Sequence, residues 1–162
     1  MEYFFKDMDS PVGRLRLVGS DKGLAAILWE NDNPKRVRVR DYVERADHPV
    51  LVETEQQLGE YFAGKRHTFS VPLDLLGTDF QKEVWSVLTT IPYGETLTYS
   101  DIARRLGNEK AVRAVGAANG RNPVSIVVPC HRVIGATGDL TGFAGGLEAK
   151  AQLLRLEGAG KR

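Results

Sequence analysis

Apolar and polar residues alternate in several stretches of the first half of the chain, which predicts β-strands there. Arg14–Leu17 alternates strictly, and Leu24–Trp29 is a mostly apolar run. Asp21-Lys22-Gly23 lies between them and is typical of a hairpin turn. The alternation over His67–Leu73 predicts one further short strand.

A helical spacing of apolar residues follows in the same half of the chain. The stretch Val50–Phe62 predicts one helix, and Gly64 is placed to end it. The apolar face consists of Val50, Leu51, the Thr54 methyl group, Leu58, Tyr61 and Phe62. The first half is therefore predicted to be a small sheet with one covering helix, and we find no residues there that indicate chemistry.

From Leu75-Leu76-Gly77 onward the pattern becomes mainly helical. Thr78-Asp79-Phe80-Gln81 is a capping box, in which the side chains at both ends satisfy free backbone N–H groups. It opens a helix that Pro92 ends. The apolar face of this helix is formed by Phe80, Val84, Val87, Leu88 and Ile91.

Two shorter helices with a glycine between them come next. Thr98-Tyr99-Ser100-Asp101 caps the first, which runs to Leu106 and stops at Gly107, and the second covers about Lys110 to Ala118. This is a helix-turn-helix pattern, although many small helical domains share it. Most side chains of the second helix are small, and Arg113 stands among them. This composition fits close packing against a neighbouring helix and insertion into a DNA groove equally well.

The residue types typical of a reactive site gather after the apolar run Val124–Val128. That run predicts a buried strand with Pro129-Cys130-His131-Arg132 at its tip. Neighbouring histidine and arginine side chains favour the thiolate form of a cysteine. Successive side chains of an extended segment point to opposite faces, so a water molecule or a local turn would have to connect Cys130 with His131.

A histidine base also needs a group that orients it. The later candidate is Glu157, at the end of an amphipathic helix that carries Leu147, Leu153, Leu154 and Leu156. From its position alone, the favoured interpretation of Glu157 is an ordinary surface residue in the last turn of a helix.

Composition limits the function classes. The 162 residues are 42% hydrophobic and 27% charged, which is typical of a globular protein, and no apolar run predicts a membrane span or signal peptide. The expected location is therefore cytoplasmic.

A net charge of +1 argues weakly against a tight, salt-driven DNA binder but allows a local basic patch. The single cysteine excludes an intramolecular disulfide and a structural zinc site of several thiolates.

Pro129-Cys130-His131-Arg132-Val133 resembles the active-site signature of the O6-alkylguanine-DNA alkyltransferases, also called methylated-DNA–protein-cysteine methyltransferases. The resemblance extends from about Thr78 to Gly158. It includes Ile91–Glu95, Ala111–Gly116, Asn122-Pro123 and Gly145-Gly146. The first half is a weaker match, because the N-terminal domain of that family is variable.

The resemblance implies a fold and a reaction. Residues 1–76 would form an RNase H-like α/β supporting domain, and residues 77–162 a mainly α winged helix-turn-helix domain that binds DNA and transfers the alkyl group. The reaction would be single-turnover DNA repair, in which O6-alkylguanine in double-stranded DNA gives its alkyl group irreversibly to Cys130. The base must first be flipped out, because O6 lies inside the stack. O4-alkylthymine is a second candidate substrate.

The same resemblance assigns roles to individual residues. Glu157 would orient His131, His131 would take the proton of Cys130 through water, and Tyr99 would donate to the guanine ring. Asn122 would be the hinge before the active-site segment. Arg113 would be the arginine finger that fills the gap left in the DNA by the flipped base. The other DNA-binding residues would be Ala114, Thr98 and Ala118. The base pocket would be lined by Tyr99, Val133, Phe143, Ala144 and Gly116.

Two positions depart from the family pattern. Phe143 stands where many members have tyrosine and cannot donate a hydrogen bond, and Ala144 stands where some have serine. The zinc-binding members need several Cys and His residues in the first half. His48, His67 and no cysteine stand there, so no metal or other cofactor is expected.

The expected partner is duplex DNA, bound through the minor groove by a monomer, with cooperative binding on DNA left open. The main alternative is a non-catalytic alkyltransferase-like protein that binds the lesion, but such proteins lack the cysteine. A transcription regulator is disfavoured by the charge and by the lack of an evident dimerisation segment. A papain-like hydrolase would need a histidine remote from Cys130, and neither His48 nor His67 lies among other site-like residues.

Overall fold

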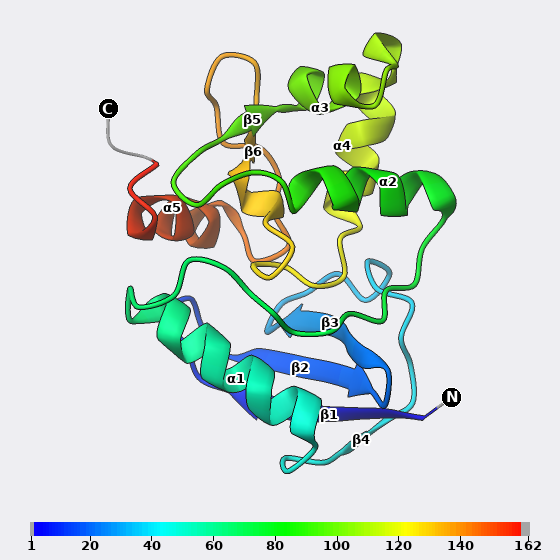
Figure 1. Ribbon diagram of the computed structural model, residues 1–162, viewed down its shortest axis with the longest axis vertical. Helices are drawn as coiled ribbons and strands as arrows, with labels where there is room; N and C mark the ends of the chain where they lie inside the picture. Colours follow the sequence, from blue (N-terminus) through cyan, green and yellow to red (C-terminus); the bar gives the residue numbers. More distant parts are fainter. Residues whose placement is uncertain (1, 160–162) are drawn as a thin grey trace.

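A four-stranded sheet with one helix on its face forms the first half of the molecule. A computed structural model of the chain describes residues 2–159. The sheet contains β1 (Tyr3–Met8), β2 (Leu15–Ser20), β3 (Gly23–Trp29) and β4 (Tyr42–Glu44) in the order β3-β2-β1-β4. Only the β1–β4 pair is parallel. α1 (Pro49–Phe62) covers the sheet, as Figure 1 shows. The sheet with one covering helix predicted from the sequence is thus confirmed.

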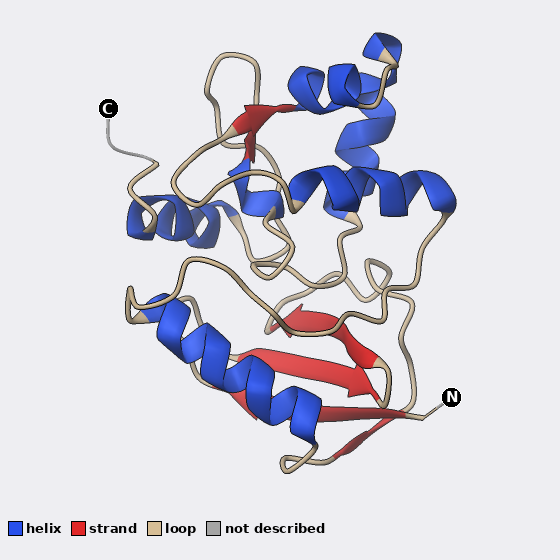
Figure 2. Cartoon of the chain, in the orientation of Figure 1, coloured by secondary structure: helices blue, strands red, loops and turns tan. Residues whose placement is uncertain are grey.

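The second half is mainly helical. Its elements are α2 (Asp79–Leu88), β5 (Leu97–Thr98), α3 (Tyr99–Arg105), the short 3-10 helix η1 (Glu109–Ala111), α4 (Val112–Gly120), the 3-10 helix η2 (Cys130–Arg132), β6 (Val133–Ile134) and α5 (Leu147–Leu156). The helices gather above the larger sheet, and β5 and β6 form a two-stranded parallel sheet beside them (Figure 2). Both expected capping boxes are present, at Thr78 with Gln81 and at Thr98 with Asp101.

The two halves share one apolar core. Leu24, Ile27 and Tyr61 of the first half belong to the same buried cluster as Trp85 and Val124 of the second. The free edge of β3 also joins them, because the Ile27 N–H donates to the Pro123 carbonyl over 2.8 Å. The first half therefore fixes the segment that leads to Cys130.

Two predicted strands are wrong. Residues 67–73 make only an isolated bridge, in which Leu73 pairs with Leu24. The run Val124–Val128 is also irregular, and Ile126 has a positive φ of 76°. Both segments reach the free edge of β3, so neither obtains a full ladder, and burial of alternate apolar side chains produced the strand-like pattern. α2 also ends at Leu88, three residues before the expected Ile91.

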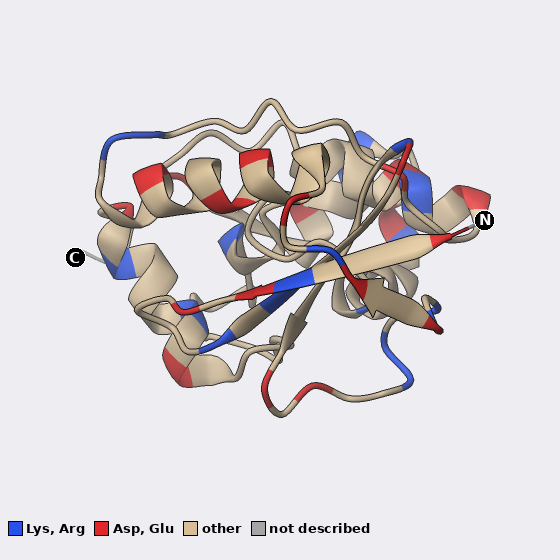
Figure 3. Ribbon diagram, turned by 90° about the horizontal axis from the view of Figure 1, so that it is seen from below, with Lys and Arg blue, Asp and Glu red and all other residues tan. Residues whose placement is uncertain are grey.

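Among the described residues, no helix is long and apolar enough to cross a bilayer. Charge is distributed unevenly over the molecule. α1 carries Glu53, Glu55 and Glu60 and no Lys or Arg, which is visible as red bands without blue in Figure 3. Because carboxylates repel phosphate, the charge of this helix is unfavourable for contact with nucleic acid.

The loop before α5 packs closely against the first half of the chain at a glycine, Gly145. A Cβ atom on Gly145 would lie 2.5 Å from the buried indole ring of Trp29. We expect Gly145→Ala to lower the free energy of unfolding by about 1–3 kcal/mol, because neither the ring nor the backbone can give way cheaply. Urea unfolding measures this. Gly142→Ala is the matched control, since a Cβ there would meet nothing within 4 Å, and equal losses in the two variants would contradict this account.

Candidate active site

Cys130 lies at the start of η2, at the junction of the two halves. Its side chain is buried, with 4% of the residue exposed. The preceding loop is held by Asn122, whose amide Nδ2 donates to the Val128 carbonyl over 2.8 Å while its Oδ1 accepts from the Val124 N–H over 3.1 Å. Asn122 therefore lies between α4 and the cysteine and holds the loop that leads to Cys130, and its role as a hinge stays a prediction.

The segment Cys130–Arg132 is a 3-10 turn, so the expectation of extended backbone there is wrong. The turn closes because the Arg132 N–H donates to the Pro129 carbonyl over 3.0 Å. No hydrogen bond joins the Cys130 sulfur to the His131 ring. A bridging group between them is still required for proton transfer.

His131 and Glu157 form a fully buried pair. The His131 Nε2 atom lies 2.7 Å from Oε2 of Glu157, which requires the proton of the neutral ring to be on Nε2. Nδ1 is then the basic nitrogen, and it is buried without a hydrogen-bond partner among the described residues. The imidazole thus has one nitrogen held by a carboxylate and one free to accept a proton.

Glu157 accepts from further donors, so it is not an ordinary surface residue. Arg132 Nε donates to Oε1 over 2.8 Å, and its Nη2 donates to Oε2 over 3.0 Å. The Tyr61 hydroxyl donates to Oε2 over 2.5 Å. Arg132 also donates to the Ile91 carbonyl through Nη1, over 2.6 Å. The carboxylate is therefore ionised and held rigidly.

Burial and charge set the protonation states of these groups. Burial alone would raise the pKa of Glu157, but hydrogen bonds from His131 and Arg132 hold that pKa well below its usual range. Burial lowers the pKa of His131 and raises the pKa of the Cys130 thiol, and the Asn122 amide opposes the latter shift in part. Both groups are consequently neutral at neutral pH in the resting site, which suits a base that takes the thiol proton only as the sulfur reacts.

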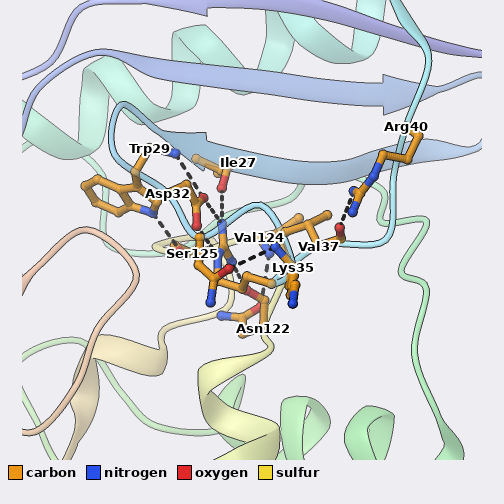
Figure 4. A network of polar contacts seen from close by, with 11 residues as sticks. Ile27, Trp29, Asp32, Lys35, Val37, Arg40, Asn122, Val124 and Ser125 are labelled. Atoms are coloured by element: carbon orange, nitrogen blue, oxygen red, sulfur yellow. Dashed lines mark hydrogen bonds and ion pairs between the residues drawn. The ribbon is translucent and has the colours of Figure 1, made fainter.

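A buried arginine from the first half supports the hinge. Arg36 is paired with Asp32 over 2.6 Å and donates to the backbone carbonyls of Ile27 and Asn122. Ile27, Asp32 and Asn122 surround this network in Figure 4. The charge of Arg36 also helps to lower the pKa of Cys130.

Tyr99 and Gly116, two of the residues predicted to line a pocket, lie next to each other. The Tyr99 ring is about 3.8 Å from the place a Cβ on Gly116 would take, and its hydroxyl is hydrogen-bonded to the Thr141 hydroxyl. Val133 is buried, and its carbonyl accepts from Lys150 Nζ over 2.6 Å. Phe143 packs edge-on against Trp29 and is half-buried, as is Ala144. These last two residues lie on the loop before α5.

α4 presents small residues to solvent. Arg113, Ala114 and Ala117 are exposed, whereas Val115 and Ala118 face the core. The Ala118 carbonyl accepts from the Trp85 indole over 2.8 Å, so this residue supports the helix from inside and its side chain does not reach the surface. Thr98 caps α3 through its side chain and is half-buried.

Four side chains that contact the site had no assigned role in the sequence analysis: Arg36, Tyr61, Thr141 and Lys150. Arg132 was expected to favour the Cys130 thiolate, and the structure shows it bonded to Glu157 instead. Lys150 could have been found, because it lies on the apolar face of α5 with Leu153 and Leu154, where a lysine is unusual unless it is paired. Tyr61 gave no signal, since tyrosine is common on the apolar face of a helix. No cluster of metal-binding side chains occurs within residues 2–159.

Known proteins match both halves of the chain. Residues 4–75 match the ribonuclease-like domain of 6-O-methylguanine DNA methyltransferase, and residues 79–159 match its DNA binding domain. A methylated-DNA–protein-cysteine methyltransferase of Methanosarcina mazei is 49% identical over 154 residues, which cover 95% of this chain and 96% of that protein. A relative of the same name from Mycolicibacterium paratuberculosis is 47% identical over 94% of this chain and 91% of its own length.

Solved structures agree. The crystal structure of Mycobacterium tuberculosis OGT in complex with DNA superposes with a TM-score of 0.85 at 45% identity, covering 98% of this chain and 94% of the other. The fold and site define a two-domain protein in which a DNA-binding half carries a buried thiol beside an imidazole–carboxylate pair. The chain belongs to the 6-O-methylguanine DNA methyltransferase family. The predicted pairing of a ribonuclease-like α/β domain with a helical DNA-binding domain is confirmed.

Proposed function

We propose that the protein repairs DNA by moving the alkyl group of O6-alkylguanine to the sulfur of Cys130. The observation that carries this proposal is the placement of the only cysteine of the chain next to the buried His131–Glu157 pair, in a chain whose relatives are methylated-DNA–protein-cysteine methyltransferases. No cofactor takes part in the proposed reaction.

The proposed step balances without a further reactant. His131 takes the thiol proton at Nδ1 through a bridging water, while Glu157 stabilises the resulting imidazolium. The sulfur forms a bond to the alkyl carbon, the bond from that carbon to O6 breaks, and the electron pair passes to the guanine. Tyr99 donates to the ring as negative charge grows there. The product is a thioether with no good leaving group, so each molecule acts once.

Access to O6 requires the base to leave the duplex. We propose that the exposed face of α4, which carries small side chains, enters the minor groove. Ala114 would lie against the DNA backbone, and Arg113 would occupy the gap left by the flipped base. Thr98 would add a backbone contact at the start of α3. Val133, Phe143, Ala144 and Gly116 would line the pocket with Tyr99. A monomer suffices for this arrangement, and cooperative binding and O4-alkylthymine repair are extensions to test. Location in the cytoplasm stays part of the proposal.

One experiment tests the proposal directly. The protein is incubated with duplex DNA that contains O6-methylguanine, and its peptides are then mapped by mass spectrometry. We expect a methyl group on Cys130 and unmodified guanine in the DNA, in equal amounts. Tight binding to the lesion without modification of Cys130 would instead favour the non-catalytic lesion-binding alternative.

Arg113 offers a separate prediction about DNA. No ion pair or hydrogen bond holds its exposed side chain within the described part of the chain. We expect Arg113→Ala to slow repair of duplex DNA by about tenfold or more. The DNA with the flipped-out base then loses the side chain that fills the gap in the base stack, and unstacking costs a few kcal/mol. Reaction with free alkylated guanine should change much less. Arg155→Ala, at an exposed position on α5, is the matched control, and equal losses on both substrates would refute this role.

A further inference from the structure

Tyr61 connects the first half of the chain to the carboxylate of the site. It lies in the last turn of α1, is fully buried, and donates its hydroxyl proton to Oε2 of Glu157 over 2.5 Å. Burial, followed by the nearby charge of Glu157, raises its pKa far above that of a free phenol. The side chain therefore stays protonated and remains a donor.

Tyr61 and His131 share one oxygen of the carboxylate. Oε2 accepts from Tyr61, from His131 Nε2 over 2.7 Å and from Arg132 Nη2 over 3.0 Å, whereas Oε1 accepts from Arg132 Nε and weakly from the Gly94 N–H over 3.4 Å. Each extra donor withdraws negative charge from Oε2. A strong third donor makes that oxygen a weaker acceptor for the imidazole.

Besides Tyr61 and His131 themselves, four titratable or charged groups face the thiol, the imidazole or the carboxylate. They are Arg132 on η2, Lys150 on α5, Tyr93 after α2 and Arg36 before β4. Tyr93 packs edge-on against Tyr61, but its hydroxyl donates to the Leu156 carbonyl over 3.3 Å and does not bond Glu157. It is thus a natural reference for Tyr61.

We propose that Tyr61 is a positioning residue for the transfer reaction, which moderates the acceptor strength of Glu157 and so sets the pH at which His131 takes the proton of Cys130. This inference rests on the proposed function for its kinetic consequence. It gives the ribonuclease-like half a part in the chemistry, in place of a purely supporting one.

The sign of the effect follows from the shared oxygen. Without the Tyr61 hydroxyl, Oε2 binds the His131 N–H more strongly, and the imidazolium is favoured. The pKa of His131 then rises, and the equilibrium between the thiol–imidazole and thiolate–imidazolium forms of the site shifts toward the charged pair. Because His131 must be neutral to take the thiol proton, the ascending part of the curve of transfer rate against pH should move up by about half a unit to one unit.

Tyr61→Phe keeps the ring and removes only the hydroxyl. We expect it to shift the rate curve to higher pH, with Tyr93→Phe as the matched control that leaves the curve in place. Nitrogen NMR of the imidazole of His131 gives a second readout, in which the pKa of His131 rises in Tyr61→Phe only. This readout needs no alkyl transfer, so it separates failure of the inference from failure of the proposed function.

A second variant covers the case in which Tyr61→Phe does not fold. Site-specific incorporation of 3-fluorotyrosine at position 61 keeps the contact and makes the phenol a stronger donor, so the rate curve should move to lower pH and the pKa of His131 should fall. Opposite shifts in the two variants establish the role. An unchanged pKa of His131 in either folded variant, or shifts of the same sign in both, would overturn it and leave Tyr61 a packing residue.

Discussion

Cys130→Ala and Cys130→Ser are expected to abolish alkyl transfer while leaving the fold and lesion binding intact. The alanine variant has no nucleophile. The serine variant keeps the volume, but its hydroxyl is far less acidic than a thiol, and the resting His131 is too weak a base to ionise it. The measurement is single-turnover transfer of a radiolabelled methyl group from duplex DNA to protein.

Two controls make the Cys130 result decisive. Urea unfolding should show a change within about 1–2 kcal/mol for both variants, since a small buried side chain is replaced by one of similar or smaller size. Fluorescence anisotropy should show that both still bind duplex DNA with O6-methylguanine. A labelled protein in either variant would place the acceptor on another residue and defeat the proposed mechanism.

Local sequence patterns predicted an element correctly where its backbone hydrogen bonds are made within the element itself, as in a helix. α1 ends as expected, with Gly64 at a positive φ of 77° just past its last turn, and the capping boxes mark the starts of α2 and α3. β1 and β4 were not identified individually. β1 includes the charged residues Lys6 and Asp7, which pair with Glu55 and Arg16 respectively and break the expected alternation.

The site was predictable only in part, because its residues come from distant segments. The Pro-Cys-His-Arg motif pointed to Cys130 and His131 directly. The resemblance was needed to choose Glu157, since its burial depends on Arg132 and on a tyrosine 96 positions earlier in the chain. Arg36 and Tyr61 could not be chosen at all, because a pattern of apolar positions does not report which polar atom meets which across a domain junction.

The second large effect is expected at Glu157. Replacement with glutamine removes the negative charge and turns one acceptor oxygen into an NH₂ group, which then faces donors from Arg132, Tyr61 or His131. Because the Arg132 guanidinium is left buried without a counter-charge, we expect a loss of about 3–5 kcal/mol in the free energy of unfolding. The transfer rate should fall by about 100-fold, since His131 loses its orienting partner.

The pH dependence of stability identifies the cause. The pKa of Glu157 is lower in the folded protein than in the unfolded chain, so the unfolded state binds more protons near that carboxyl's ordinary pKa. This stabilisation is therefore complete above the unfolded pKa of 4.5 and is lost as the pH falls toward the folded pKa. His131, with a lowered pKa, adds a loss of the same sign below its unfolded value of 6.5.

Urea unfolding from pH 7 to pH 3 should consequently show a steep acid loss in the parent protein and a shallower one in Glu157→Gln. Glu83→Gln is the matched control, because Glu83 is exposed on α2, so its curve should follow the parent. If Glu157→Gln lost stability by the same amount at every pH, the carboxylate would act through packing alone. A weaker acid loss together with slow transfer would show that one charge both stabilises the domain junction and prepares the base.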